Sequence, residues 1–415
     1  MSNPSSPPVT SSPTSAPILP ERLVYSLLLA AIATMAMGQT LVFSLLPLLG
    51  RAVGLRELQI GIIITASSAV YAVATRAWGR HSDRLGRKYV ILIGLTGYTV
   101  GTLVFTSLFW LGFEQLLRGT FLWLALILAR CLQSSVMAGT MPASNAYVSD
   151  ITSLENRTTG IARLGAANST GTIIGPAMGG MLAGISLLAP LYFAAFMTFS
   201  SLLLIWIFLP ESPRPLVQPH HASPARLRFI DKRYGHFLLI AMVMFTAFSM
   251  VIQTLGFYFQ DTLQLSSQLA AKKVGFALML SAGLSLLAQG LLVQHLRWPA
   301  WRLIHTGLFF LIAGSVLLAV GGTAFFLFAG VACCGLGIGL SYPGCVAAAS
   351  LTVGADEQGA LAGLTTALPA IGSIIGPVLG TGLYEISPHW PYAGNLFLLL
   401  PVFVYALRQA RLHRR

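Results

Sequence analysis

One basic residue stands out among the side chains of this sequence that could take part in chemistry. Arg130 lies inside a long apolar stretch, about nine residues or ~14 Å from the start of the helix that this stretch predicts. Burying a guanidinium in an apolar medium is costly, so we expect Arg130 to face a cavity or a polar partner. Two interpretations stay open, a role in binding or coupling and a structural tether to Gln133 or to backbone carbonyls.

The other chemistry-bearing residues do not form a catalytic pattern. Paired acids, a Ser/Lys or Ser/His arrangement, or clustered metal ligands within the apolar stretches are absent, as are HExxH, CxxC and Walker-type spacings. The four cysteines, at positions 131, 333, 334 and 345, all lie in apolar stretches and are expected to pack as small hydrophobic residues. We therefore expect no enzymatic activity, no metal and no cofactor.

Composition indicates that lipid surrounds the elements that hold these residues. Hydrophobic residues make up 55% of the 415 positions and charged residues only 9%, which leaves too little polar surface to solvate a globule of this size. A helix needs about 20 apolar residues to cross a bilayer. The chain supplies twelve such stretches, so the predicted fold is an all-α membrane protein with twelve transmembrane helices.

The predicted spans are evenly divided along the chain. The first six are Leu23–Leu49, Leu58–Trp78, Tyr89–Leu111, Phe121–Ser144, Ile161–Leu187 and Leu191–Leu209. The second six are His236–Phe259, Val274–Gln294, Leu303–Gly321, Ala324–Leu351, Leu361–Tyr384 and Gly394–Leu407.

The positive charge of the chain predicts its orientation. Most of the 25 Lys and Arg residues fall in alternate loops, and loops rich in them stay in the cytoplasm. We therefore expect both termini to be cytoplasmic in a bacterial-type inner (plasma) membrane. The net charge of +13 is interpreted as this topology signal and not as a site for nucleic acid.

A polar connection divides the chain into two six-helix bundles. The predicted parts are a disordered Ser/Pro-rich tail, a first bundle, a cytoplasmic linker, a second bundle and a basic tail, at 1–20, 21–210, 211–235, 236–410 and 411–415. The segments GTIIGPAMGGML (171–182) and GSIIGPVLGTGL (372–383) are identical at seven of twelve positions. This repeat predicts two pseudo-symmetric halves with the transport path between them.

The repeated segment is expected to be a helix-packing hinge. Glycines four residues apart share one helix face, which permits close packing and lets the halves seal and part, and proline can bend the helix. The residues assigned to it are Gly171, Gly175, Pro176, Gly179, Gly180, Gly376 and Pro377. The alternative is ordinary tight packing.

Three motifs resemble the major facilitator superfamily over the chain from about Glu21 onward. The loop Gly79-Arg-His-Ser-Asp83-Arg84-Leu-Gly86-Arg87-Lys88 is similar to its signature loop, and Arg130-Cys-Leu-Gln133 to its Arg-x-x-Gln-Gly element, with Ser134 in place of Gly. The motif from Gly171 to Gly180 is similar to that of the drug:proton antiporter branch. The resemblance implies a monomeric, proton-coupled exporter that works by alternating access.

The signature loop implies a gate. In the family the acid equivalent to Asp83 meets the start of the eleventh helix, which here begins near Gln358. Gly79 would let backbones approach closely, and the basic residues Arg84, Arg87 and Lys88 would engage Asp150 or Glu155. We interpret the loop, including Gly86, as a latch for the cytoplasmic side; the alternative is a basic topology anchor.

Polar and aromatic residues on the first, fourth, seventh and tenth spans are the candidates for substrate contact. They are Gln39, Phe43, Arg130, Gln133, Gln253, Phe257 and Tyr342, and for each the alternative is plain helix packing. All twelve acids fall in loops or near span ends. Arginine without a buried acid favours anionic or zwitterionic small molecules, such as siderophore-like chelators. The rival functions are proton-coupled uptake and generic export of lipophilic compounds.

Overall fold

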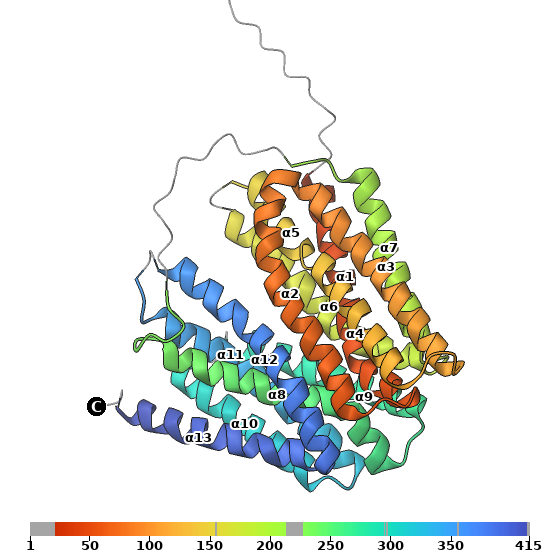
Figure 1. Ribbon diagram of the computed structural model, residues 1–415. Coiled ribbons are helices and arrows are strands. Elements are labelled where there is room, and N and C mark those ends of the chain that lie inside the picture. The colour runs from red at the N-terminus through yellow and green to blue at the C-terminus, as the bar shows by residue number, and fades with distance from the viewer. Residues whose placement is uncertain are drawn as a thin grey trace, which may run out of the picture.

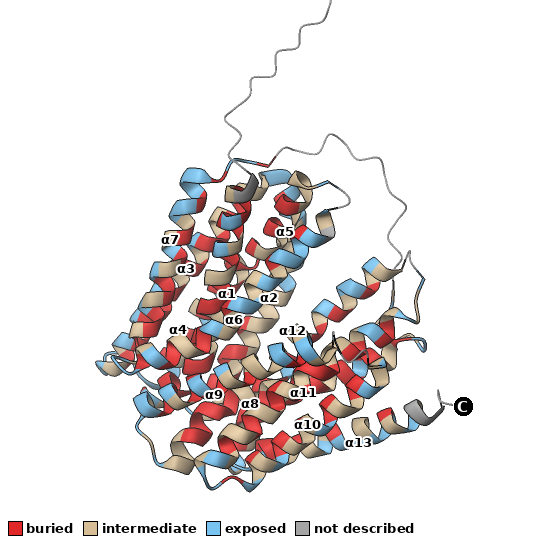
Figure 2. Cartoon of the chain, turned by 180° about the vertical axis from the view of Figure 1, so that it is seen from behind, coloured by how far each residue is buried: buried red, intermediate tan, exposed pale blue. Residues whose placement is uncertain are grey.

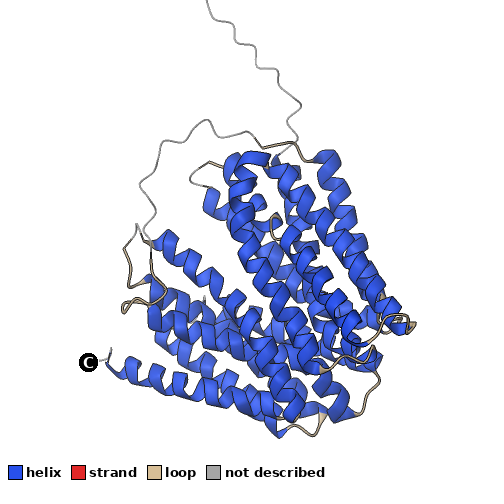
Figure 3. Ribbon diagram, viewed as in Figure 1, coloured by secondary structure: helices blue, strands red, loops and turns tan. Residues whose placement is uncertain are grey.

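The computed structural model describes residues 21–153, 156–212, 227–293, 295, 298–354 and 357–412. Every regular element in these ranges is a helix (Figure 3), which confirms the predicted all-α class. The predicted tail 1–20, most of the linker 211–235 and residues 413–415 lie outside the described residues, so these boundaries stay predictions. Helices are the expected solution in lipid, where each backbone amide must find its hydrogen bond within its own segment.

Each predicted span corresponds to helical structure. The first half contains α1 (Glu21–Ala52), α2 (Glu57–Leu85), α3 (Arg87–Phe113), α4 (Gly119–Met137), α5 (Thr140–Ile151), α6 (Arg157–Ala183) and α7 (Ala189–Phe208). The second contains α8 (Gly235–Leu263), α9 (Ser267–Leu287), η1 (Ala288–Val293), α10 (Ala300–Val320), α11 (Ala324–Ser350), α12 (Gln358–Ile386) and α13 (Trp390–Leu412). The fourth span is thus two helices broken at Ala138 and Gly139, and the eighth ends in a π-helical turn.

Eleven spans in the described ranges are long and apolar enough to cross a membrane. The exception among the twelve is α6, whose first turns carry Thr, Asn, Ser and Gly residues. This helix packs between α1 and α9, so protein rather than lipid surrounds much of it. Large apolar side chains elsewhere point outward, as Phe121 and Phe397 do with exposed fractions of 78% and 77%. Figure 2 shows the buried residues on the helix faces that meet other helices, an arrangement that suits a multi-pass membrane protein.

The two bundles meet at one end and diverge at the other (Figure 1). Contacts between them pair α2 with α12, α6 with α9, and α1 with both α8 and α9. We name the end where α7 finishes and α8 begins the linker end. The opposite end, with the α1–α2 and α12–α13 turns, is the closed end. In the described ranges, the hydrogen bonds between the halves all lie toward the closed end. They join Arg51 to Asp261, Leu58 to Glu385 and Thr65 to Ile374.

The repeated glycine segments make equivalent contacts in the two halves. A Cβ added at Gly171 or Gly175 would overlap the backbone oxygen of Ala33 or Met37 on α1. Likewise, a Cβ added at Gly376 would overlap Ser249 and Thr246 on α8. For Gly171 and Gly175 the structure shows the alternative, ordinary tight packing, because their side of α6 contacts α1 inside its own bundle and not the other half.

A neighbouring pair of glycines does lie between the halves. A Cβ at Gly180 of α6 would meet the backbone of Ala271 and Gly275 on α9, and one at Gly275 would meet Pro176 and Gly180. Through these residues the backbones of α6 and α9, one from each half, lie close together at the closed end.

Gly175→Ala should lower the melting temperature of the detergent-purified protein, because the added methyl group has no space against the α1 backbone. Overpacking of this kind costs about 1–3 kcal/mol. Gly165→Ala on the same helix is the matched control, since nothing lies within 4 Å of its added Cβ; it should leave the melting temperature unchanged or slightly higher. Equal melting temperatures for the two variants would contradict the tight α1–α6 contact.

Candidate functional site

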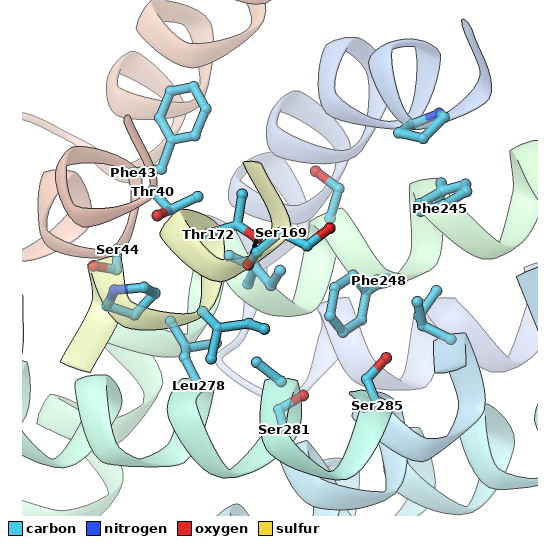
Figure 4. A pocket seen from close by; sticks show the side chains of 18 of the residues that line it. Thr40, Phe43, Ser44, Ser169, Thr172, Phe245, Phe248, Leu278, Ser281 and Ser285 are labelled. Atoms are coloured by element: carbon cyan, nitrogen blue, oxygen red, sulfur yellow. Dashed lines mark hydrogen bonds between the residues drawn. The ribbon is translucent and has the colours of Figure 1, made fainter. Parts of the chain in front are cut away.

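A cavity of about 400 Å³ lies between the two halves. Helices α1 and α6 supply one wall, and α8, α9, η1, α11 and α12 supply the other (Figure 4). Its size is that of pockets which hold small organic ligands. We call it the central cavity, and its position agrees with the path between the halves that the sequence repeat predicts.

The wall of the central cavity is apolar and aromatic with many uncharged polar groups. Phe43, Phe245 and Phe248 contribute the rings, and none of the described residues that line it is Asp, Glu, Lys, Arg or His. The polar lining residues are Thr40, Ser44, Ser169, Thr172, Ser249, Gln253, Ser281, Ser285, Gln289 and Ser373.

Three of these polar residues form a ladder on one helix. Ser281, Ser285 and Gln289 recur every fourth position, so they share one face of α9 and its π-helical extension. In Figure 4 the Ser281 and Ser285 hydroxyls point into the cavity. Glycines at 335 and 339 of α11 lie against the backbone of Ser281 and Ser285, so the two helices pack closely behind the ladder.

Arg130 does not lie on the cavity wall. Its side chain is only 1% exposed and donates a 2.5 Å hydrogen bond from Nη1 to Oε1 of Gln133. The guanidinium carbon lies 5.1 Å from the centre of the Phe43 ring and 5.7 Å from that of Phe105. Phe43 lines the cavity, whereas Arg130 is not among its described lining residues. Of the two expected surroundings, a cavity or a polar partner, the structure shows the partner, and of the two interpretations it shows the tether to Gln133.

Gln133 is fully engaged inside the first half. Its Nε2 donates to the backbone oxygen of Tyr98 at 3.1 Å and to Oγ1 of Thr102 at 2.7 Å, while its Oε1 accepts from Arg130. Like Arg130, it is absent from the cavity wall. The Arg-x-x-Gln element thus joins α3 to α4.

The remaining cavity candidates divide between wall and surroundings. Phe43 and Gln253 line the cavity, whereas Gln39 does not. The ring of Tyr342 packs against that of Phe245, with centroids 5.1 Å apart, and Tyr342 is also outside the lining. Phe257 is fully buried at the closed end, with its ring 4.8 Å from the guanidinium carbon of Arg51.

An ion pair joins the halves at the closed end. Arg51 Nη1 donates to Asp261 Oδ1 at 2.6 Å, and Nη2 donates to Glu57 Oε1 at 2.5 Å and to Asp261 Oδ2 at 3.1 Å. The Tyr384 hydroxyl donates to the same Asp261 carboxylate at 2.7 Å. We call these four residues the closed-end cluster. Bidentate geometry and several partners make such a network stronger than an isolated surface pair.

Sequence reasoning missed the closed-end cluster, although a signal was present. Arg51 lies in the last turn of α1 and Asp261 in the last turn of α8, and these helices are equivalent members of the two halves. Opposite charges at the ends of the first helix of each half would have suggested a contact. Because both residues were assigned only to loops or span ends, this contact was not predicted.

The signature loop forms a second charged cluster at the linker end, within the first half. Arg87 donates to Asp83 at 2.5 Å and to Asp150 at 3.1 Å, so the structure contains the expected contact between a basic loop residue and Asp150. The backbone N–H of Lys88 donates to Glu211 Oε1 at 3.1 Å. Gly86 adopts φ 102° beside this carboxylate, a backbone conformation that favours glycine.

Other parts of the latch prediction are not seen in this conformation. The ion pair of Asp83 is with Arg87 and not with α12. No atom lies within 4 Å of a Cβ added at Gly79, so the close backbone approach expected there is wrong here. Arg84 is exposed, and Glu155 lies outside the described residues.

The start of α12 already has a carboxylate beside it. Arg233 donates to Glu357 at 2.9 and 3.1 Å and also pairs with Asp231. These hydrogen bonds lower the pKa of Glu357 below its ordinary value, so the pair persists to lower pH than the ordinary pKa of a glutamate would allow. The residues just before α8 are thereby fixed to α12 within the second half.

Comparison with known proteins identifies the fold family. The family model for the Major Facilitator Superfamily matches residues 28–377. The chain belongs to this superfamily. It is therefore a transporter and not an enzyme, as the three sequence motifs indicated.

Curated relatives align with this superfamily member over nearly their whole length. Multidrug resistance protein 2 of Bacillus subtilis (strain 168) is 27% identical, with 92% of this chain and 93% of the relative covered. The class G tetracycline resistance protein of Vibrio anguillarum is 29% identical, over 85% and 88% of the two chains. The crystal structure of the nucleoside transporter NupG shares the fold, with a TM-score of 0.73 at 15% identity and coverage of 94% and 99%.

Asp261→Asn should favour conformations in which the closed end is open, because it removes the charge that Arg51 binds across the halves. Loss of a partly exposed ion pair of about 1 kcal/mol shifts such an equilibrium roughly fivefold. Spin labels at Arg56→Cys and Gln264→Cys, in a protein without its native cysteines, should report a longer and broader distance by pulsed electron resonance.

The matched control for this measurement is Asp231→Asn. Asp231 also pairs with an arginine, but inside the second half, so its substitution should leave the distance between the labels unchanged. An unchanged distance in Asp261→Asn would show that the ion pair does not hold the closed end together.

Proposed function

We propose that this superfamily member is a secondary-active exporter of small lipophilic organic molecules. The central cavity carries this proposal, since it is of ligand size, lies between the halves and combines aromatic rings with hydroxyl and amide groups. The names of the curated relatives, which include multidrug and tetracycline resistance proteins, support export over uptake.

The placement of Arg130 changes which of the sequence hypotheses is preferred. The expected anionic or zwitterionic cargo depended on a positive potential in the cavity, but Arg130 is not among the described lining residues, none of which carries a charge. Electrostatic preference for a siderophore-like chelator is therefore not supported. Generic export of lipophilic compounds, the alternative from the sequence, suits the uncharged wall better.

Alternating access would exchange the contacts at the two ends. With both termini in the cytoplasm, the closed-end cluster would face outward, and this conformation would admit cargo from the cytoplasm. Rocking of one half against the other would break the Arg51–Asp261 pair. The same motion would bring Asp83 toward the start of α12, where the proposed latch would hold the cytoplasmic side closed.

Proton coupling, if it drives the cycle, would act at the ends of the helices. None of the residues that line the cavity is a carboxylate, whereas each end holds an arginine between two acids. Protonation of either acid would weaken its hold on that arginine. The coupling groups of this proposal are therefore Asp83 and Asp150 at the linker end and Glu57 and Asp261 at the closed end.

Everted membrane vesicles that contain the protein should accumulate radiolabelled chloramphenicol, an uncharged aromatic molecule, when a proton gradient is imposed, and a protonophore should abolish the accumulation. Radiolabelled citrate should not accumulate, because the described cavity wall offers it no positive side chain. Arg130→Gln should reduce the rate for chloramphenicol without changing the preference between the two, since Arg130 holds Gln133 where it joins α3 to α4.

Vesicles from cells without the protein are the control. Accumulation of chloramphenicol only in right-side-out vesicles would indicate uptake and overturn the proposed direction. Preferential transport of citrate that is lost in Arg130→Gln would restore the anionic hypothesis.

A further inference from the structure

One buried amide in the central cavity has no hydrogen-bond partner. Gln253 of α8 is only 5% exposed, and its Oε1 is a buried oxygen without a donor in the described part of the chain. The same is true of several buried polar atoms elsewhere, such as Tyr98 Oη and Asn395 Oδ1, but those residues lie outside the cavity wall. Among the described residues, Gln253 is the one that both lines the cavity and holds an unmet acceptor, and a half-turn of its terminal amide would exchange Oε1 with Nε2 and bring the oxygen to the cavity side.

An unmet buried acceptor indicates a ligand with a matching donor. A carbonyl oxygen removed from water without a new hydrogen bond is unfavourable, and a donor on a bound molecule recovers that loss. A molecule of the same shape without the donor leaves the oxygen unpaired and binds less tightly. The side chain therefore discriminates between ligands by the presence of an N–H or O–H group.

The other cavity glutamine differs from Gln253 in this respect. Nε2 of Gln289 donates to the Ser285 hydroxyl at 3.3 Å, within the polar ladder of α9 and η1. Both glutamines line the same cavity. The two glutamines thus allow a comparison between an amide that donates a hydrogen bond to a neighbouring side chain and one whose oxygen has no donor.

The surroundings of Gln253 define the rest of the ligand. Phe245, Phe248, Ser249 and Ile252 of α8 line the cavity together with Gln253. Phe43 and Ser44 face them from α1. Aromatic rings beside an uncharged hydrogen-bonding group suit a ligand with a flat apolar body, and a formal charge would lose hydration without gaining a counter-charge.

We infer that Gln253 is the specificity-determining residue of the central cavity, and that the cargo is an uncharged aromatic molecule which donates an N–H or O–H to Gln253 Oε1. The inference rests on the proposed export function and names the chemical class of its cargo. Phe43 and Phe248 hold the apolar body, and Gln253 selects the molecule by its donor.

Three coumarin dyes test the inference with the purified full-length protein in nanodiscs. 7-Amino-4-methylcoumarin is uncharged and has the N–H donor, its 7-dimethylamino analogue lacks the donor, and its 3-acetic acid derivative has the donor and a negative charge. Dissociation constants from fluorescence should show that the donor improves binding about tenfold and that the anionic dye binds more weakly than the parent.

Substitution of Gln253 should remove the preference for the donor. Gln253→Met keeps the length of the side chain and should bring the ratio of the two dissociation constants close to one. Gln289→Met is the matched control and should keep the tenfold ratio. Gln253→Glu retains an acceptor and should retain the preference, which separates loss of recognition from loss of folding.

The outcomes distinguish this inference from the proposed function. An unchanged ratio in Gln253→Met, stronger binding of the anionic dye, or no binding of any dye to folded wild-type protein would overturn the inference. Chloramphenicol accumulation in everted vesicles would still test export separately. Donor-dependent binding in a protein that exports nothing would leave the role of Gln253 intact and refute the export proposal.

Discussion

The absence of water in the bilayer interior is the constraint on which the rest of this structure depends. A backbone amide or a polar side chain in lipid must find its partner within the protein. The backbone meets this requirement by forming helices, and the polar side chains meet it by turning toward other helices. Glycine faces then bring the helices close enough for those contacts, with α6 against α1 and α12 against α8.

Two arginines show how the same constraint gives different results. Arg130 is deep inside the first half, where Gln133 accepts its hydrogen bond and the Phe43 and Phe105 rings lie near its guanidinium. Arg51 is at the end of α1, is partly exposed and binds two carboxylates, one from each half. A buried arginine without an acid stabilises the arrangement of its own bundle. An arginine between acids of different bundles can release one of them, and so it suits a contact that must form and break.

The central cavity differs from both arginine sites because none of its described lining residues carries a charge. It retains hydroxyl and amide groups, because such groups are tolerated without a counter-charge where a ligand supplies the missing partner. Phe43 belongs to both environments, since it lines the cavity and its ring centre lies 5.1 Å from the guanidinium carbon of Arg130.

The sequence by itself determined the features that depend on local composition. Apolar stretches of sufficient length specify helices in lipid, and the repeat of Gly171–Leu182 at Gly372–Leu383 specifies two equivalent halves. The loop from Gly79 to Lys88 also specified the family and the pairing of a basic residue with Asp150. These properties follow from the chain within one helix, one loop or one repeat.

Only the tertiary structure decided which side chains meet across helices. The rotation of α4 places Arg130 beside Phe43 of α1 and Phe105 of α3, and the rotation of α8 places Gln253 on the cavity wall. Sequence spacing fixes which residues share a helix face, but it does not fix what that face packs against. For the same reason the ion pair between Arg51 and Asp261, 210 positions apart, is specified by the packing of two bundles.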